Sequence, residues 1–214
     1  MILAIDTTAE TGSIALVDGA NVVEQVELHS PDGFAHVLFG EIEALLDRHG
    51  LAPRDIGVFA AASGPGSFTG VRVGLTAAKG LAEAAGRKAA AVSNLQALAF
   101  FGTHSLRAPV IDARRGEIYG AVYNDALEIV ADEVAMPIDA WLSILPPGEI
   151  EFITAGFPLP GVRTTVTEAP LALACAIGRI AAAHPIFAKD PASIDANYVR
   201  RPDIRLPAGL SGPR

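Results

Sequence analysis

Short apolar runs separated by turn residues open the chain. Runs of this kind predict β-strands, and the tight connections between them predict a meander of three neighbouring strands. Asp18-Gly19 supplies one of the turns. The predicted strands cover residues 2–5, 13–17 and 22–28.

The next segment changes to helical spacing. Apolar positions from Phe34 to Leu46 recur every three or four residues and predict a helix over residues 34–49, which Gly50 ends. Val37 and Phe39 widen the apolar face of this helix beyond a single stripe. The extra width suggests a second packing partner, although a broad contact with the core is the commoner cause.

Strands and helices alternate along the rest of the chain. A helix predicted over residues 71–85 is rich in glycine and alanine, small residues that let another helix or a sheet approach closely. The other predicted helices cover residues 94–101, 138–144 and 171–183, and the other predicted strands cover residues 58–62, 89–92, 109–112, 117–123, 127–134 and 151–155.

The two halves of the chain share one order: strand, strand, strand, helix, strand, helix. Three leading strands followed by alternation predict an α/β fold with mixed sheets, built as two lobes that face each other. We place the N-terminal lobe at residues 1–104 and the C-terminal lobe at residues 105–201. Residues 202–214 contain three prolines and two glycines and are predicted to form a loose tail.

Composition and charge restrict the function. Half of the 214 residues are apolar and 19% are charged, which is ample material for a core. The net charge of −8 disfavours autonomous nucleic-acid binding, although a more basic partner can bring an acidic protein to RNA. The single cysteine, Cys175, allows no internal disulfide and is expected to be a small buried hydrophobe. We expect a cytoplasmic protein, because the start lacks the basic region of a signal peptide and no apolar run is long enough to span a membrane.

A glycine-rich loop, Gly64-Pro65-Gly66-Ser67-Phe68-Thr69-Gly70, joins a predicted strand to a predicted helix. Backbone N–H groups at such a junction can hold an anion, whereas Ser67 or Thr69 could instead cap the helix. The loop lacks the lysine of a P-loop and the glycine spacing of a dinucleotide site. A tight turn explains the glycines but not the whole run.

Three further runs carry polar chemistry. Asp6-Thr7-Thr8 follows the first strand and could hold Mg²⁺ and phosphate or, equally, satisfy local backbone donors. The run from Asp112 to Tyr119 reads by itself as a charged hairpin turn. Residues 197–201 form a basic patch that by itself has no specificity.

Together these runs resemble the TsaB (YeaZ) family. The resemblance is carried by residues 58–74, by Ala77-Ala78-Lys79-Gly80-Leu81, by residues 92–99, by Asp112-Ala113-Arg114-Arg115-Gly116-Glu117-Ile118-Tyr119 and by Tyr198-Val199-Arg200. It covers residues 1 to about 201. The resemblance implies an actin/hexokinase/Hsp70-like (ASKHA) fold with two lobes.

The resemblance also implies a function. Members of this family support formation of threonylcarbamoyladenosine (t6A) at adenosine 37 of ANN-decoding tRNAs. TsaC makes the threonylcarbamoyl-adenylate, TsaD transfers the group to tRNA, and the ATPase TsaE joins the complex. The implied role of this chain is that of a scaffold that binds TsaD directly, meets TsaE in the complex, and reaches tRNA only through the complex.

Two groups of site residues follow from the resemblance. The partner-binding group lies on two first-lobe helices and comprises His36, Val37, Phe39, Gly40, Val71, Gly74, Leu75 and Ala78. The second group forms a nucleotide- or phosphate-like loop, either a relic or part of a shared site, and comprises Asp6, Thr7, Thr8, Gly64, Gly66, Ser67, Thr69 and Gly70. We expect ATP and Mg²⁺ to act only in the complex with partners, and no cofactor to bind the chain alone.

The chain is not expected to be the catalyst. TsaD carries a His-x-x-x-His metal pair, and the corresponding positions here are Asn94 and Leu98, of which Leu98 cannot bind a metal. No two of the five histidines are three or four residues apart. These features predict no metal site and argue against a metallopeptidase.

A small-molecule kinase or ATPase of the same fold class is the alternative function. It would draw on Asp6, Asp112 and the glycine-rich loop, and Asp112 is the candidate general base. The run Thr154-Ala155-Gly156-Phe157-Pro158 argues against it, because it offers one glycine and then a bulky side chain where nucleotide-using relatives carry a glycine pair. Without TsaD, the exposed partner helices could pair with a second copy of the chain, giving a homodimer.

Overall fold

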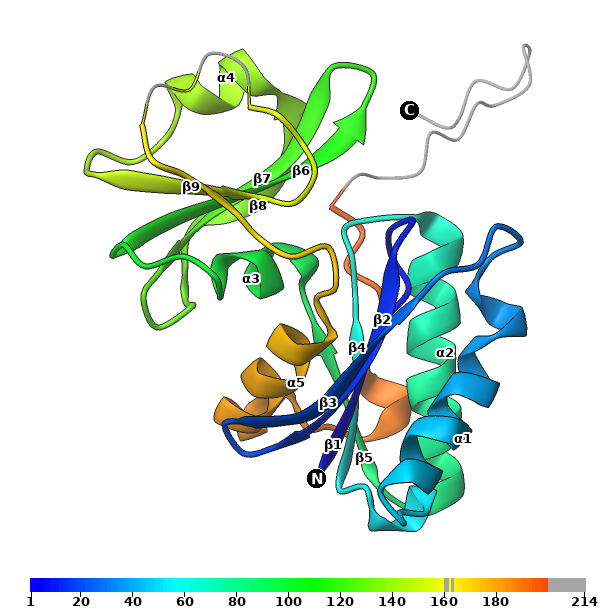
Figure 1. The fold of residues 1–214 in the computed structure, drawn as a ribbon. Coiled ribbons are helices and arrows are strands. Elements are labelled where there is room, and N and C mark those ends of the chain that lie inside the picture. The colour runs from blue at the N-terminus through cyan, green and yellow to red at the C-terminus, as the bar shows by residue number, and fades with distance from the viewer. Residues whose placement is uncertain (160–161, 163, 200–214) are drawn as a thin grey trace, which may run out of the picture.

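The described residues form two five-stranded sheets with helices around them (Figure 1). The structure is a computed structural model and describes residues 1–159, 162 and 164–199. The predicted tail at residues 202–214 lies outside the described residues. None of the helices in the described part of the chain combines the length and the apolar character that a membrane crossing needs.

The first sheet has the strand order β3-β2-β1-β4-β5. The first three strands pair antiparallel, and β4 and β5 run parallel to β1. Every residue of β1 is buried because helices cover both faces of the sheet. The strands are β1 (Ile2–Asp6), β2 (Gly12–Asp18), β3 (Asn21–Leu28), β4 (Val58–Ala62) and β5 (Lys88–Val92).

The second sheet repeats this topology. Its strand order, taken from the other edge, is β8-β7-β6-β9-β10, which corresponds to β3-β2-β1-β4-β5 of the first sheet. The antiparallel and parallel pairings are also the same. The strands are β6 (Leu106–Arg114), β7 (Glu117–Asn124), β8 (Ile129–Pro137), β9 (Ile150–Thr154) and β10 (Val166–Glu168). The prediction of a duplicated α/β fold with mixed sheets is confirmed. The sequence did not predict β10, because three residues are too few to show a period.

Within the described part of the chain, five α-helices accompany the sheets. They are α1 (Leu38–Arg48), α2 (Phe68–Ala85), α3 (Asn94–Ala99), α4 (Ile138–Ser143) and α5 (Ala174–Ala183). The helix predicted over residues 34–49 divides into a 3₁₀ turn, Phe34–His36, and α1, with Val37 between them at φ −107°. Helix α2 begins three residues earlier than predicted, because Ser67 caps it by accepting a hydrogen bond from the Gly70 N–H (3.3 Å).

The two lobes are connected through the helix that closes each half of the chain. Helix α5 follows the second sheet but packs on the first, mainly against β1 and β2, while α3 follows the first sheet and packs against β6 and β7. Gly178 of α5 permits the close approach, since a Cβ there would lie 2.6 Å from Cγ2 of Val17. The sequence-based division at residues 104 and 105 stays a prediction, and α5 crosses it.

Glu151 anchors the connection between the sheets. Its buried carboxylate accepts hydrogen bonds from the N–H groups of Thr103 (2.6 Å) and His104 (2.8 Å) and from the Thr167 hydroxyl (2.5 Å). Burial by itself would raise the pKa of Glu151, but these hydrogen bonds outweigh it and lower the pKa below its usual value. The segment that leads from α3 into β6 is thereby fixed to β9.

Candidate functional site

Asp6 is the last residue of β1, with 1% of its surface exposed. Its Oδ1 accepts hydrogen bonds from the backbone N–H (3.0 Å) and the hydroxyl (2.6 Å) of Thr8, so the expectation that this run satisfies local donors is confirmed for one oxygen. Its Oδ2 is buried and has no hydrogen-bond partner among the described residues. Burial therefore raises the pKa of Asp6, an effect that the hydrogen bonds from Thr8 partly offset.

The glycine-rich loop is fastened to this turn. The Ser67 N–H donates to the Thr8 carbonyl (2.7 Å), and the Thr7 hydroxyl donates to the Gly70 carbonyl (2.7 Å). Asn94 joins the two from α3: its amide donates to the Thr8 hydroxyl (2.7 Å), and its Oδ1 accepts from the Gly64 N–H (2.9 Å). Sequence reasoning had treated Asn94 only as the place of a missing histidine.

The close approach of loop and turn explains the glycines. A Cβ at Gly70 would lie 1.9 Å from the Thr7 carbonyl oxygen, and a Cβ at Gly66 would lie 2.7 Å from the Thr8 carbonyl oxygen. One helical turn after Gly70, a Cβ at Gly74 would lie 2.8 Å from the Thr7 hydroxyl oxygen. These glycines let the loop pack on residues 6–8, and Ser67 rather than the exposed Thr69 caps the helix.

A cleft of about 750 Å³ lies between the two lobes, beside the turn at residues 6–8 and the glycine-rich loop. Asp6, Thr8 and Ser67 line it from the first lobe, and Asp112 and Arg114 line it from the second. Asp112 is paired, unlike Asp6: its Oδ1 accepts from the Arg114 N–H (2.7 Å), and its Oδ2 lies 3.3 Å from the Arg114 guanidinium. The run at residues 112–119 is a hairpin turn, as its residues predict, with Arg114 and Arg115 at positive φ.

Polar groups on the second-lobe wall of the cleft are hydrogen-bonded within the chain. The Gly156 N–H already donates to the Glu168 carboxylate (2.6 Å), and the Thr154 hydroxyl closes the turn by donating to the Phe157 carbonyl (2.8 Å). Phe157 itself lines the cleft. Among the described residues, the first lobe thus presents the unpartnered Oδ2 of Asp6 near the cleft, while Thr154 and Gly156 of the second lobe are engaged within the chain.

The predicted partner-binding residues divide into two sets. His36, Phe39 and Gly40 are exposed and Val37 is half-buried, whereas the four predicted positions on α2 are buried in the core of this chain. The buried set is Val71, Gly74, Leu75 and Ala78. These four can support a partner surface from beneath but do not form it, and a partner role for either set stays a prediction.

The exposed face of α2 carries Gly80 and Ala84, two of the small residues expected to permit close approach, together with Thr76, and none of the three is in the predicted partner-binding group. Thr76, Gly80 and Ala84 are exposed at intervals of four, and a Cβ at Gly80 would meet nothing within 4 Å. Beside them, α1 and α2 border an apolar groove of about 360 Å³ lined by Phe39, Ile42, Leu46, Leu51 and Leu81 among others. The helical period of exposed small residues could have revealed this face from the sequence.

Comparison with known proteins agrees with this architecture. A family model described as TsaD, tRNA N6-adenosine threonylcarbamoyltransferase, matches residues 31–191. The "tRNA threonylcarbamoyladenosine biosynthesis protein TsaB" of Bacillus subtilis is 37% identical over 149 residues. The chain belongs to the TsaB (YeaZ) family. This family assignment confirms the resemblance inferred from the motifs.

The alignments differ in extent. The match to the Bacillus subtilis protein covers 67% of this chain and 65% of the relative, and a TsaB of Escherichia coli is 38% identical over 58% of this chain and 54% of its own length. A solved structure from Pseudomonas aeruginosa with similarity to peptidase YeaZ superposes with a TM-score of 0.77 at 25% identity, covering 93% of this chain and 99% of that one. The fold is therefore the two-lobed ASKHA type that the motifs predicted.

The burial of Asp6 predicts a pH-dependent stability. Its folded-state pKa is raised above the ordinary value of 3.8, so the folded state holds the proton more tightly than the unfolded state does. The protonated carboxyl therefore stabilises the fold relative to the charged one. This contribution is complete below pH 3.8, the unfolded-state pKa, and is lost as the pH rises through the raised folded-state pKa. We expect Asp6→Asn to be more stable than the wild type at pH 7, with the difference shrinking toward pH 4, as measured by urea unfolding.

Thr8→Val provides the control for this prediction. It removes a hydroxyl that bonds Asp6 without removing the buried charge, so we expect it to be less stable than the wild type at pH 7. Equal stability of Asp6→Asn and wild type at both pH values would contradict the account of a buried, charged Asp6.

Proposed function

We propose that this TsaB-family protein is a non-catalytic subunit needed for threonylcarbamoyl transfer to tRNA, and that it acts by binding a TsaD-type transferase. The observation that carries the proposal is the exposed face formed by α1 and α2, with its apolar groove. Its relatives are named for threonylcarbamoyladenosine biosynthesis, and the matching family model is that of the transferase itself.

The chemistry of this face suits a helical partner. Phe39 is 56% exposed at the edge of the groove, so its ring extends the apolar surface of the groove, and contiguous apolar surface of this kind marks interaction sites. Gly40 and Ala44 on α1 and Gly80 and Ala84 on α2 are exposed small residues that let a partner helix approach closely. Aromatic anchors beside well-packed small residues are typical of interface centres.

Charge around the groove favours a basic partner. Glu43 and Asp47 border it, and the chain carries a net charge of −8. Direct binding of tRNA by such a surface is unfavourable. We therefore propose that tRNA meets this protein only through the complex, that TsaE joins the same complex, that TsaC supplies the activated group, and that the assembly works in the cytoplasm.

ATP and Mg²⁺ are proposed to act in the complex rather than on this chain alone. Asp6 and Thr8 could hold a cation or a polar group from the first lobe, since Oδ2 of Asp6 is an available acceptor. The second-lobe groups of the cleft are already hydrogen-bonded within the chain. A partner that supplies the remaining ligands of such a site would explain why the chain keeps Asp6 buried with an available oxygen.

The unpartnered oxygen of Asp6 supports a second candidate, a nucleotide-dependent kinase or ATPase. Buried acceptors without partners often mark sites where a ligand supplies the missing contact. This candidate predicts that the isolated chain binds Mg-ATP. The engaged Gly156 N–H and the Phe157 side chain make it the weaker proposal.

Size-exclusion chromatography with light scattering, on the chain mixed with the TsaD of the same organism, tests the scaffold proposal. We expect a heteromeric mass. A mixture that elutes as two separate species would overturn the proposal. Calorimetry of the isolated chain with Mg-ATP distinguishes the second candidate, which requires tight binding and turnover where the scaffold proposal expects neither.

The same α1–α2 face predicts self-association of the chain in the absence of TsaD. Light scattering at micromolar concentration should give the mass of a dimer, and adding TsaD should convert it into the heteromer. Monomers alone across this concentration range would contradict the homodimer.

A further inference from the structure

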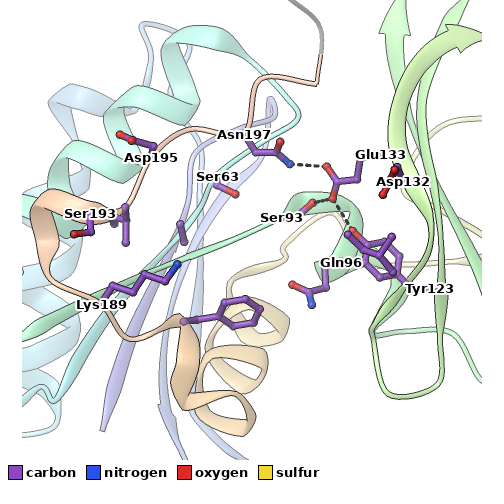
Figure 2. Close-up of a pocket in the computed structure, with 14 residues that line it drawn as sticks. Ser63, Ser93, Gln96, Tyr123, Asp132, Glu133, Lys189, Ser193, Asp195 and Asn197 are labelled. Carbon is purple, nitrogen blue, oxygen red and sulfur yellow. Dashed lines mark hydrogen bonds between the residues drawn. The ribbon is translucent and has the colours of Figure 1, made fainter.

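A second cavity of about 550 Å³ lies between the lobes (Figure 2). None of its described lining residues also lines the cleft beside Asp6. Ser63 and Ser93 line it from the first lobe, Tyr123 and Glu133 line it from the second, and Lys189 and Asn197 line it from the segment that follows α5. Three separate parts of the chain therefore meet around one space.

Glu133 of β8 is the point at which these parts are joined. Its Oε1 accepts hydrogen bonds from the Ser93 hydroxyl and from the Tyr123 hydroxyl (2.6 Å), and its Oε2 accepts from the Asn197 side-chain amide (2.5 Å) (Figure 2). Ser93 caps the N-terminus of α3, Tyr123 lies on the neighbouring strand β7, and Asn197 lies 64 residues away along the chain. One carboxylate thus fastens three elements.

The segment that carries Asn197 is firmly attached to the first lobe. Lys189 pairs with Ala89 of β5 through both backbone groups (3.0 and 2.8 Å), and the Asn197 N–H donates to the Ser63 carbonyl (2.8 Å). Just beyond it, the Tyr198 hydroxyl accepts a hydrogen bond from Nε of Arg72 on α2 (3.2 Å). We call residues 189–198 the C-terminal strap.

We propose that the Glu133–Asn197 hydrogen bond is a latch that fixes the angle between the two lobes. The C-terminal strap is bound to the first lobe along its length, and its side-chain amide reaches the second lobe at Glu133. Releasing this one contact frees β8 from the strap while leaving each lobe's own hydrogen bonds intact.

The latch is also linked to the cleft. Ser93, which donates to Glu133, is followed by Asn94, which bonds Thr8 and Gly64. These two adjacent residues direct their side chains to opposite cavities, since Ser93 lines the second cavity and Asn94 lines the cleft. A single peptide unit therefore separates the residue that bonds Glu133 from the residue that bonds the turn after Asp6.

A side-chain exchange tests the latch. Asn197→Asp places a second carboxylate against Glu133 and should break the latch. Glu133→Gln removes the negative charge of the acceptor and should weaken the latch. The double variant E133Q/N197D should close it again. In that variant Oε1 of the glutamine still accepts from Ser93 and Tyr123, and its amide can donate to the new aspartate. Asp132→Asn, at the neighbouring position on β8, is the matched control.

Interlobe distance is the readout. Spin labels at Asp18→Cys at the end of β2 and Asp139→Cys on α4, both exposed and neither on α1 nor on α2, report it in a Cys175→Ala background. Asn197→Asp should broaden or shift the distance distribution, and amide exchange in β8 should accelerate at least about tenfold. The double variant and Asp132→Asn should match the parent.

Two outcomes would overturn the latch. One is an unchanged distance distribution in Asn197→Asp. The other is a double variant that keeps its circular dichroism spectrum but stays as open as Asn197→Asp. The readout uses the chain alone, so it is independent of whether the chain binds TsaD.

Discussion

Gly70→Ala is expected to destabilise the protein by about 3 kcal/mol or more, which would lower the melting temperature by about 6–12 °C. The added Cβ would lie 1.9 Å from the Thr7 carbonyl oxygen and 2.9 Å from its carbonyl carbon. Both are backbone atoms, and backbone cannot rotate away as a side chain can. The helix would have to move off β1, breaking the hydrogen bond from the Thr7 hydroxyl to the Gly70 carbonyl.

Gly80→Ala in the same helix is the matched control. Gly80 is exposed and open space surrounds it, so alanine should leave the structure unchanged and gain up to about 1 kcal/mol from helix propensity. Thermal unfolding of the two variants against the wild type measures both effects. Similar melting temperatures for the two variants would contradict the view that the loop glycines serve close packing on residues 6–8.

Phe39→Glu is expected to weaken the complex with TsaD at least about thirtyfold, equivalent to a loss of about 2 kcal/mol. The ring is exposed at the edge of the groove between α1 and α2, so the isolated variant should fold normally. In the complex, the glutamate would bring a buried charge into an apolar contact. Calorimetric titration of the variant with TsaD measures the change.

Ile144→Glu is the control for this interface. Ile144 is 61% exposed at the end of α4 on the second lobe, so the substitution adds the same charge away from the α1–α2 face. Its affinity for TsaD should equal that of the wild type. Equal weakening by both variants would indicate a general effect of charge, and unchanged binding by Phe39→Glu would place the interface elsewhere. Val37→Glu is a less clean test, because Val37 packs against the first-lobe core.

The glycine-rich loop illustrates how a motif can have two uses. Its glycines, its serine cap and its contacts with Thr7 and Thr8 are all accounted for by packing between α2 and the end of β1. The same packing leaves Asp6 buried with a free oxygen at the edge of the cleft. A stable protein keeps such a costly group where a function or a partner uses it.

The sequence by itself determined the family and the order of strands and helices along the chain. Alternating and helical apolar periods give every strand except the three-residue β10, and the repeated order predicts the repeated sheets. The family was determined by runs such as residues 64–74, in which turn chemistry and capping residues occur at fixed spacing. Local signals are sufficient here because strands, helices and caps depend on residues within a few positions of one another.

Tertiary structure decided what those residues do. Val71, Leu75 and Ala78 have the apolar, small character of an interface but lie in the core, because α2 packs on the first sheet along that face. Nothing in the sequence indicated that Glu133 and Asn197 meet, since they are 64 residues apart. Contacts of this kind depend on how α5 returns to the first sheet and carries the C-terminal strap with it, which no local periodicity specifies.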